Sequence, residues 1–244
     1  MGDISFTGMT LKRQVKQLGD SAIVYDAQLL SQISATEFDP EHWQAAESIA
    51  GVGRGETLLI ELAGMDCVLR HYYRGGIPGR FLNDQYLWTG QERVRSIREW
   101  DLLQEIADTG LPAPIAVAAR YVRRGIWYTA DLITRRIPDV TPFSHWLEQE
   151  EKDPRIWAVV GRCIAEFHAA GFCHADLNAH NVQITNDGRV YLLDWDRGRR
   201  RAPGKWHSSN LARLHRSCQK ISGSGRVQFT PREWVDLVNG YSQL

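Results

Sequence analysis

The sequence runs His174-Ala175-Asp176-Leu177-Asn178-Ala179-His180-Asn181 and later continues Leu192-Leu193-Asp194-Trp195-Asp196. Between these two stretches lie strand-like runs at residues 182–185 and 190–193, which flank the strong turn signal Asn186-Asp187-Gly188. A hairpin returns the chain to the end from which it started, so we expect the polar residues of the two stretches to lie close together. The segment therefore predicts a site in which carboxylates and an amide converge.

Carboxylates and an amide at this spacing are typical of phosphoryl transfer, which needs mainly positioning and charge neutralisation. In enzymes resembling protein kinases, the Asp of an H-x-D-x-x-x-x-N loop accepts the proton of the acceptor hydroxyl. The Asn holds one Mg²⁺, and an Asp after the next hairpin holds Mg²⁺ that bridges the phosphates. Here Asp176 is the predicted catalytic base, and Asn181 and Asp194 are the predicted magnesium ligands. Short fragments of this kind also arise by chance in loops, but their order around a hairpin favours the kinase-like interpretation.

The composition is that of an ordinary globular chain, with 244 residues, 43% of them hydrophobic and 24% charged. Lys plus Arg and Asp plus Glu both number 29, so no overall basicity indicates nucleic-acid binding, and no nucleic-acid partner is expected. The four cysteines form no C-x-x-C pair, which favours reduced thiols packed in the core and a reducing cytoplasm.

No segment of the sequence predicts export or membrane insertion. Residues 1–20 lack the apolar core of a secretory signal, and no stretch approaches the roughly 18 apolar residues of a spanning helix. We therefore expect a chain that is neither exported nor membrane-spanning.

The first half of the chain is rich in strand patterns and the second half in helix patterns, which predicts an α+β fold with two lobes. Residues 1–135 are expected to form a nucleotide-binding lobe with an antiparallel sheet and one main helix, and residues 136–244 a small, mostly helical lobe with the catalytic and metal-binding loops. Strands are expected at residues 21–29, 51–69 with a break at 63–65, 115–121 and 126–133. Helices are expected at 38–47, 91–109, after Thr141-Pro142, from Asp153-Pro154 to Gly171, and at 206–220 and 231–241.

Two features in the first half of the chain are suited to binding the phosphates of ATP. Gly51, Gly53 and Gly55 precede a strand, where backbone N–H groups could approach phosphates without a Cβ in the way; an ordinary turn is the alternative. Arg70 at the end of the next strand and Glu99 in the main helix are expected to form the pair that grips the α- and β-phosphates. Protein kinases use Lys at the first position, and Arg keeps the charge. The alternative is that both residues are solvated surface charges.

Several further runs are more specific than general kinase motifs. They are Gly53-Arg54-Gly55, Leu69-Arg70-His71-Tyr72-Tyr73-Arg74-Gly75-Gly76, Glu99, Gly110-Leu111-Pro112-Ala113-Pro114, His174 to Asn181, and Leu193-Asp194-Trp195-Asp196. On these residues, which extend over most of the sequence, the chain resembles the bacterial lipopolysaccharide kinases, in particular those that act on 3-deoxy-D-manno-octulosonic acid (Kdo). In that family Arg at the position of Arg70 looks normal. Trp195 replaces the Phe that is more usual after the metal-binding Asp of kinases.

The resemblance implies ATP-dependent phosphorylation of a Kdo hydroxyl, in the family the 4-position, with Mg²⁺ as the metal. It implies a Kdo-bearing lipid A precursor as the partner, a role in lipopolysaccharide core biosynthesis, and a Gram-negative source. It also implies a cytoplasmic protein attached peripherally to the inner face of the cell inner membrane.

Candidate contacts to the acceptor come from position alone. Arg197 and Arg199 belong to a basic cluster after Asp194, which also contains Arg200, Arg201 and Lys205 and would suit an anionic head group; a solvated basic loop is the alternative. Arg74 lies in a loop, residues 72–88, that mixes cations with aromatic residues as membrane interfaces do; core packing of the aromatics is the alternative. His180 is expected to touch the substrate or simply to pack, whereas His174 is expected to support the loop.

Several other functions fit parts of the pattern. The acceptor could instead be a heptose of the lipopolysaccharide core, a small hydroxylated compound such as an aminoglycoside, or a protein Ser or Thr. A pseudokinase, which would bind nucleotide as a scaffold without being an enzyme, is a hypothesis from another functional class, but the intact Asp176, Asn181 and Asp194 argue against it. A nucleic-acid-binding module is suggested only by the arginine cluster, and a steep salt dependence of binding would mark it.

Overall fold

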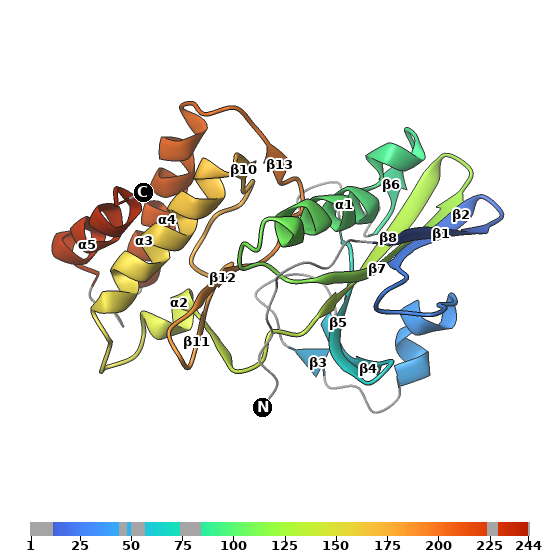
Figure 1. Cartoon of the computed structure of the whole chain (residues 1–244), viewed down its shortest axis with the longest axis horizontal. Helices are drawn as coiled ribbons and strands as arrows, with labels where there is room; N and C mark the ends of the chain where they lie inside the picture. The colour runs from blue at the N-terminus through green and yellow to red at the C-terminus, as the bar shows by residue number, and fades with distance from the viewer. Residues whose placement is uncertain (1–11, 44–47, 50–56, 74–83, 224–228, 244) are drawn as a thin grey trace. The chain divides into compact units, whose positions relative to one another are not determined.

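The structure, a computed structural model, describes residues 12–43, 48–49, 57–73, 84–223 and 229–243. By its internal contacts the chain divides into two compact units (Figure 1). Unit 1 comprises Met1–Asp108 and Pro114–Arg136, and unit 2 comprises Thr109–Ala113 and Ile137–Leu244. The two units together give a mixed fold with an antiparallel sheet and a few helices.

Unit 1 is built on an antiparallel sheet in which the described strands follow the order β1-β2-β7-β8-β5-β4-β3, with β6 paired to β8. The helix α1 (Arg95–Asp108) follows a short 3-10 turn at Gln91–Arg93 and packs against β7. The strands are β1 (Arg13–Leu18), β2 (Ser21–Asp26), β3 (Ser48–Ile49), β4 (Thr57–Leu62), β5 (Met65–His71), β6 (Tyr86–Leu87), β7 (Ala116–Arg124) and β8 (Trp127–Arg135).

Helix α1 packs against the sheet through one apolar face and two hydrogen bonds. Ile97, Trp100 and Leu103 recur at helical spacing and are almost fully buried. The Gln104 amide donates to the Ala116 carbonyl at 2.8 Å, and the Ser96 hydroxyl donates to a carbonyl of β7. The apolar spacing in the sequence correctly predicted this helix, and only its first turn differs, because Val94 is extended.

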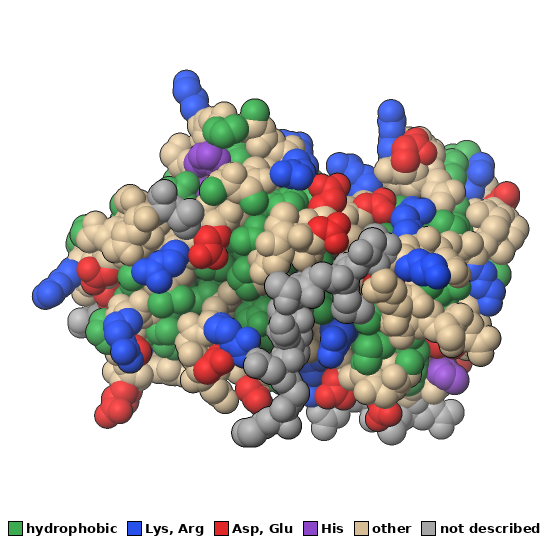
Figure 2. Space-filling view, in the orientation of Figure 1, with side chains coloured by type: hydrophobic (Ala, Val, Ile, Leu, Met, Phe, Trp, Pro, Cys, Tyr) green, Lys and Arg blue, Asp and Glu red, His purple; other side chains and the backbone are tan. Residues whose placement is uncertain are grey.

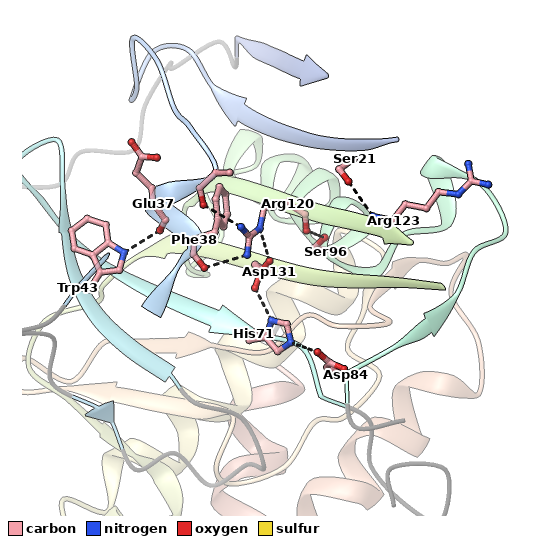
Figure 3. Close-up of polar contacts among 11 residues, drawn as sticks. Ser21, Glu37, Phe38, Trp43, His71, Asp84, Ser96, Arg120, Arg123 and Asp131 are labelled. Atoms are coloured by element: carbon pink, nitrogen blue, oxygen red, sulfur yellow. Dashed lines mark hydrogen bonds and ion pairs between the residues drawn. The ribbon is translucent and has the colours of Figure 1, made fainter. Parts of the chain in front are cut away.

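A buried charge network holds the middle of this sheet (Figure 3). Asp131, 1% exposed, accepts hydrogen bonds from His71 Nδ1 at 2.7 Å and Arg120 Nε at 2.8 Å. The same guanidinium donates to the carbonyls of Ala35 and Phe38, so it ties the segment after β2 to the sheet. Burial disfavours a charged imidazole, but the hydrogen bonds and charges of Asp131 and Asp84 outweigh it and raise the pKa of His71.

Unit 2 is mostly helical, with small sheets. The hairpin β11–β12, predicted from the turn at residues 186–188, is present and is extended by β9 in the order β12-β11-β9, while β10 pairs with β13. The helices are α2 (Phe143–Trp146), α3 (Arg155–Ala169), α4 (Trp206–Ser222) and α5 (Pro231–Tyr241), and the strands are β9 (Val140–Pro142), β10 (Phe172–Cys173), β11 (Val182–Thr185), β12 (Val190–Leu192) and β13 (Arg199–Arg200).

Helices α3 and α5 pack closely because glycines lie at their contact. A Cβ on Gly161 would collide with the Leu237 carbonyl oxygen, and one on Gly240 would collide with the Ala158 carbonyl oxygen. Helix α3 ends near Gly171, whose φ of +80° is the left-handed conformation that glycine adopts without strain. The chain passes from there through β10 into the loop that begins at His174.

Two local expectations were wrong, and one strand was not predicted. The strand β1 was not expected, because most of its side chains are polar and exposed. In the expected helix at residues 38–47, the structure shows only 3-10 turns, at Thr36–Phe38 and Pro40–Trp43, and residues 44–47 lie outside the described part. Pro142 does not start a helix but ends the edge strand β9, a position at which its missing N–H is tolerated; the helix begins at Phe143.

All four cysteines are buried and unpaired, as expected. Burial raises the pKa of the Cys67 thiol to about 11 and that of Cys218 to about 12, so both are protonated and unreactive at neutral pH. Among the described residues, no helix is both long enough and apolar enough to cross a membrane.

Candidate functional site

Unit 1 contains a buried ion pair between β5 and α1. Arg70 Nη2 lies 2.5 Å from Glu99 Oε2, and the Glu99 side chain is only 3% exposed, whereas that of Arg70 is 26% exposed. The structure thus brings together the two residues that the sequence paired. It excludes the alternative that Glu99 is a solvated helix charge.

Tyr72 completes this pair and was not anticipated. Its hydroxyl donates to Glu99 Oε2 at 2.5 Å and accepts from Arg70 Nη2 at 3.1 Å, and its ring lies 4.7 Å below the guanidinium. Burial and then the negative charge of Glu99 raise the pKa of Tyr72 well above its usual value, so the phenol stays protonated and donates. Alternation along an extended chain places residues 70 and 72 on one face, and this was the available signal.

Three of the proposed nucleotide contacts and one acceptor contact lie outside the described residues. These are Gly51, Gly53, Gly55 and Arg74. The segment with the glycines connects β3 to β4, which pair in antiparallel register. The connection therefore joins neighbouring strands of the same sheet that carries Arg70 on β5.

In unit 2 the loop after β10 is fixed by His174. The His174 ring is 1% exposed; its Nδ1 accepts from the Asp176 backbone N–H at 3.1 Å, and its Nε2 donates to the Leu193 carbonyl at 2.7 Å. Burial lowers the pKa of His174, which keeps the ring neutral with one donor and one acceptor nitrogen. His174 therefore connects the loop of Asp176 to the residue before Asp194, in the supporting role that we expected.

Asn181 makes the second connection between the two loops. Its side-chain Nδ2 donates to the Asp176 backbone carbonyl at 2.9 Å, and its backbone carbonyl accepts from the Leu193 N–H at 2.8 Å. The amide nitrogen is thereby oriented toward the loop, and the amide oxygen is the atom that could bind a cation. Asp194 follows directly, with a φ of 60°, a left-handed conformation that Asp adopts more readily than most residues.

This donor set fits Mg²⁺. An amide oxygen and a carboxylate are the hard oxygen ligands that Mg²⁺ takes, and Mg²⁺ usually combines one or two such groups with substrate phosphates. Among the described residues, no cluster of three or more His, Cys, Asp or Glu side chains could hold a metal by itself. A magnesium ion held jointly by Asn181, Asp194 and phosphate oxygens matches that arrangement.

Asp176 lies at the surface of unit 2, beside an arginine that was not among the predicted site residues. Its Oδ1 accepts a hydrogen bond from Arg213 Nη1, with the two side chains 52% and 49% exposed. Arg213 belongs to α4, which also contacts the loop through Asn210 and Ser217. The Asn210 amide donates to the His174 carbonyl at 2.9 Å, and the Ser217 hydroxyl accepts from the Ala179 N–H at 3.1 Å.

The residue after Asp194 is a packing residue. Trp195 is 1% exposed, stacks on Phe167 at 5.0 Å between ring centroids and lies 4.7 Å from the His174 ring. Its indole nitrogen donates to the Leu192 carbonyl at 2.9 Å. An aromatic body with one satisfied donor thus fixes the strand end from which Asp194 projects.

The acceptor candidates are distributed unevenly. Arg197 is exposed and has a φ of 61°, and Arg199 is exposed on β13 opposite Cys173, directly before the His174 loop. Their neighbours Arg200 and Arg201 lie over the rings of Phe172 and Trp206, so these two cations serve packing. On the face that Figure 2 shows, Lys and Arg side chains (blue) are scattered among Asp and Glu side chains (red), without one sign dominating.

His180 is partly buried next to Asn181. Its backbone N–H donates to Asn178 Oδ1 at 2.9 Å, whereas its Nδ1 is buried with no hydrogen-bond partner among the described residues. Burial and then the neighbouring His145 lower the pKa of His180. The ring is therefore neutral at pH 7, and packing is the role that these contacts support.

Comparison with known proteins identifies relatives. The model of the lipopolysaccharide kinase (Kdo/WaaP) family matches residues 41–241. Proteins named 3-deoxy-D-manno-octulosonic acid kinase are similar over most of their length. The one from Xylella fastidiosa (strain M23) is 38% identical over 91% of this chain and 90% of the relative. The one from Vibrio parahaemolyticus is 35% identical over 94% and 98%, and the one from Haemophilus influenzae (strain Rd) is 39% identical over 86% and 91%.

Proposed function

From the premise that the chain belongs to the lipopolysaccharide kinase (Kdo/WaaP) family and is an ATP-dependent phosphotransferase, we propose that it phosphorylates a hydroxyl of the Kdo sugar on a Kdo-bearing lipid A precursor. The relatives named 3-deoxy-D-manno-octulosonic acid kinase support this acceptor, and the 4-hydroxyl is the position that the family resemblance suggests. The reaction belongs to lipopolysaccharide core biosynthesis.

The observation that supports this chemistry best is the state of Asp176. Its backbone is fixed by His174 and Asn181, yet its carboxylate is half exposed. A base must be held in position and still be reachable by the acceptor, and Asp176 meets both conditions. Asp176 would orient the sugar hydroxyl and accept its proton as the phosphoryl group is transferred.

Asn181 and Asp194 would hold Mg²⁺, which neutralises phosphate charge during the transfer. In unit 1, Arg70 would bind the α- and β-phosphates of ATP. Glu99 and Tyr72 hold its guanidinium from one side, so fewer of its conformations must be given up on binding. Gly51, Gly53 and Gly55 would cover the phosphates with backbone N–H groups.

We also propose a two-lobed, protein-kinase-like fold, in which residues 1–135 form the nucleotide-binding lobe and residues 136–244 the catalytic lobe. The strand order β3-β4-β5-β8-β7 and the helix between β5 and β7 support this assignment, because β5 carries the cation and α1 carries its partner carboxylate. Because the acceptor is a lipid, the protein would act peripherally at the cytoplasmic face of the inner membrane.

The test is transfer of labelled γ-phosphate from ATP with Mg²⁺. The acceptors are a Kdo-bearing lipid A precursor and the same precursor without Kdo. We expect label on the Kdo-bearing lipid only. Label on neither lipid, but on a heptose-bearing core, a small hydroxylated compound or a protein, would overturn the acceptor assignment, and ATP binding without transfer to any of them would indicate a pseudokinase.

A further inference from the structure

Asp176 and Arg213 form one hydrogen bond with each other, and both side chains have further hydrogen-bonding capacity. Among the described residues, Asp176 is the only hydrogen-bond partner of the Arg213 guanidinium. Guanidinium has five N–H donors, so donors beyond this one bond are available. Asp176 uses Oδ1 for this bond, and its other carboxylate oxygen can face a hydroxyl. A base and a cation thus lie side by side on a surface that is open to solvent.

The position of Arg213 is set by the helix that carries it. Asn210 and Ser217, which lie on the same side of α4 one turn before and one turn after, hydrogen-bond to the backbone of His174 and Ala179. Leu214, beside Arg213, is fully buried. Because α4 is attached to the catalytic loop at two points, the guanidinium is held at a fixed place relative to the base, as a specificity group must be.

Stability alone gives little reason for this arrangement. Ion pairs between half-exposed side chains contribute little to folding, because water screens them. The backbone contacts from His174, Asn181, Asn210 and Ser217 already fix the loop without Arg213. The charge of Arg213 is therefore free to serve the ligand that approaches Asp176.

We propose that Arg213 binds the carboxylate of the acceptor sugar and thereby selects an acidic sugar over a neutral one. This inference rests on the proposed function, since the Kdo of that function is an octulosonic acid. Arginine presents paired N–H donors in a plane that matches a carboxylate, and such charged pairs are stronger than neutral hydrogen bonds. The sugar carboxylate on Arg213 would hold the sugar so that one hydroxyl meets the second oxygen of Asp176.

The experiment compares two acceptors and four proteins. The acceptors are a Kdo-bearing lipid A precursor and the same lipid with its Kdo carboxyl group converted to the carboxamide. The proteins are wild type, Arg213→Gln, Arg213→Lys and Arg216→Gln. Arg216 is an exposed arginine on the same helix. Among the described residues it makes no hydrogen bond or ion pair to the catalytic loop, so it serves as the matched control.

For wild type we expect kcat/KM to be roughly 10- to 100-fold lower on the carboxamide than on the acid, the range of one charge-assisted interaction. Arg213→Gln should lose a similar factor on the acid, mainly through KM, and should treat the two acceptors alike within about threefold. Arg213→Lys should keep part of the preference, because it keeps the charge but not the planar fork. Arg216→Gln should behave as wild type.

Three outcomes would overturn the inference. Arg213→Gln could lower kcat equally on both acceptors, which would mean that the Arg213 guanidinium acts on the transferred phosphate or on Asp176 and not on the sugar carboxylate. It could also leave the preference for the acid intact. If wild type labels neither acceptor, the proposed function itself fails. That result differs from the first two because it appears in the unaltered protein.

Discussion

Each unit contains an arginine–carboxylate pair, and the two pairs differ mainly in their exposure. In unit 1 the Glu99 carboxylate is 3% exposed and accepts from both Arg70 and Tyr72. In unit 2 the Asp176 carboxylate is 52% exposed and accepts from Arg213. A buried carboxylate is closed to a substrate and can only hold its partners in place, whereas an exposed carboxylate can be reached by a substrate.

The comparison shows that the same chemical pair can serve two purposes, depending on what surrounds it. In the function we propose, the working group of unit 1 is the arginine, which the buried acid would orient. In the function we propose, the working group of unit 2 is the acid, and the arginine would meet the acceptor. The predictions that follow test this contrast, beginning with the largest effect.

Loss of the Asp194 charge should be the most damaging change to activity. Asp194→Asn preserves tolerance of the left-handed backbone, since Asn adopts a positive φ as readily as Asp, so the variant isolates the loss of charge. We expect no detectable Mg²⁺-dependent phosphate transfer, measured with labelled ATP. Asp196→Asn, two residues along, is the control. Turnover of Asp194→Asn near that of wild type would exclude Asp194 as a metal ligand.

Breaking the buried pair should cost stability as well as activity. Arg70→Met leaves Glu99 buried without its cation, and we expect a loss of about 2–3 kcal/mol in the free energy of unfolding. This lies below the full cost of an unpaired buried charge, because Arg70 is partly exposed and Tyr72 still donates. Urea unfolding measures it. Adding Glu99→Gln should recover part of the loss, and a further loss instead would show that the pair is not the source.

The pH dependence of stability should differ in sign between the units. The pKa of His71 is raised in the folded protein, so protonated His71 stabilises the fold. This contribution to the free energy of unfolding is fully present at a pH below the unfolded pKa of about 6.5, and it is lost as the pH rises through the folded pKa. For His168 in unit 2, burial lowers the pKa to about 4. Neutral His168 therefore makes its full contribution to the free energy of unfolding at a pH above about 6.5. It is lost as pH falls toward 4, by at most about 1.4 kcal/mol per pH unit.

Urea unfolding of wild type, His71→Gln and His168→Gln between about pH 5 and about pH 8 tests these signs. The stability difference between wild type and His71→Gln should shrink as pH rises. The difference between wild type and His168→Gln should shrink as pH falls. Two differences that change in the same direction would contradict the assignment of opposite charge states to the two histidines.

The smallest effect is expected for the stability of Arg213→Gln. Because both members of its pair are about half exposed, the free energy of unfolding should change by less than about 0.5 kcal/mol. Urea unfolding beside Arg70→Met gives the direct contrast. A loss as large as that of Arg70→Met would mean that the exposed pair also holds the fold.

The arrangement of the loop that contains Asp176 and Asn181 could be predicted from the sequence because its signals are local. Asp176, Asn181 and Asp194 are related by short spacings, and the turn at residues 186–188 fixes the hairpin between them. The pairing of Arg70 with Glu99 could be inferred from the order of strand and helix. These predictions need only local patterns and the rule that hairpins return to their starting point.

Arg213 could not be predicted in the same way. It lies 37 residues from Asp176, and the rotation of α4 that aims it at the loop depends on the packing of Leu214 and on the bonds of Asn210. Tyr72 was missed although its spacing from Arg70 was visible, because its partner Glu99 becomes close only when α1 packs on the sheet. Contacts that depend on such packing leave little trace in one sequence.

The central claim is that Asp176 is the catalytic base of a kinase acting on Kdo, and the most direct test is the rate of phosphate transfer by Asp176→Asn. With labelled ATP, Mg²⁺ and the Kdo-bearing lipid A precursor, we predict a turnover about 10²- to 10⁴-fold below that of wild type. ATP affinity and unfolding free energy should stay near wild-type values, because Asp176 is half exposed. Near-normal turnover by Asp176→Asn would contradict the account.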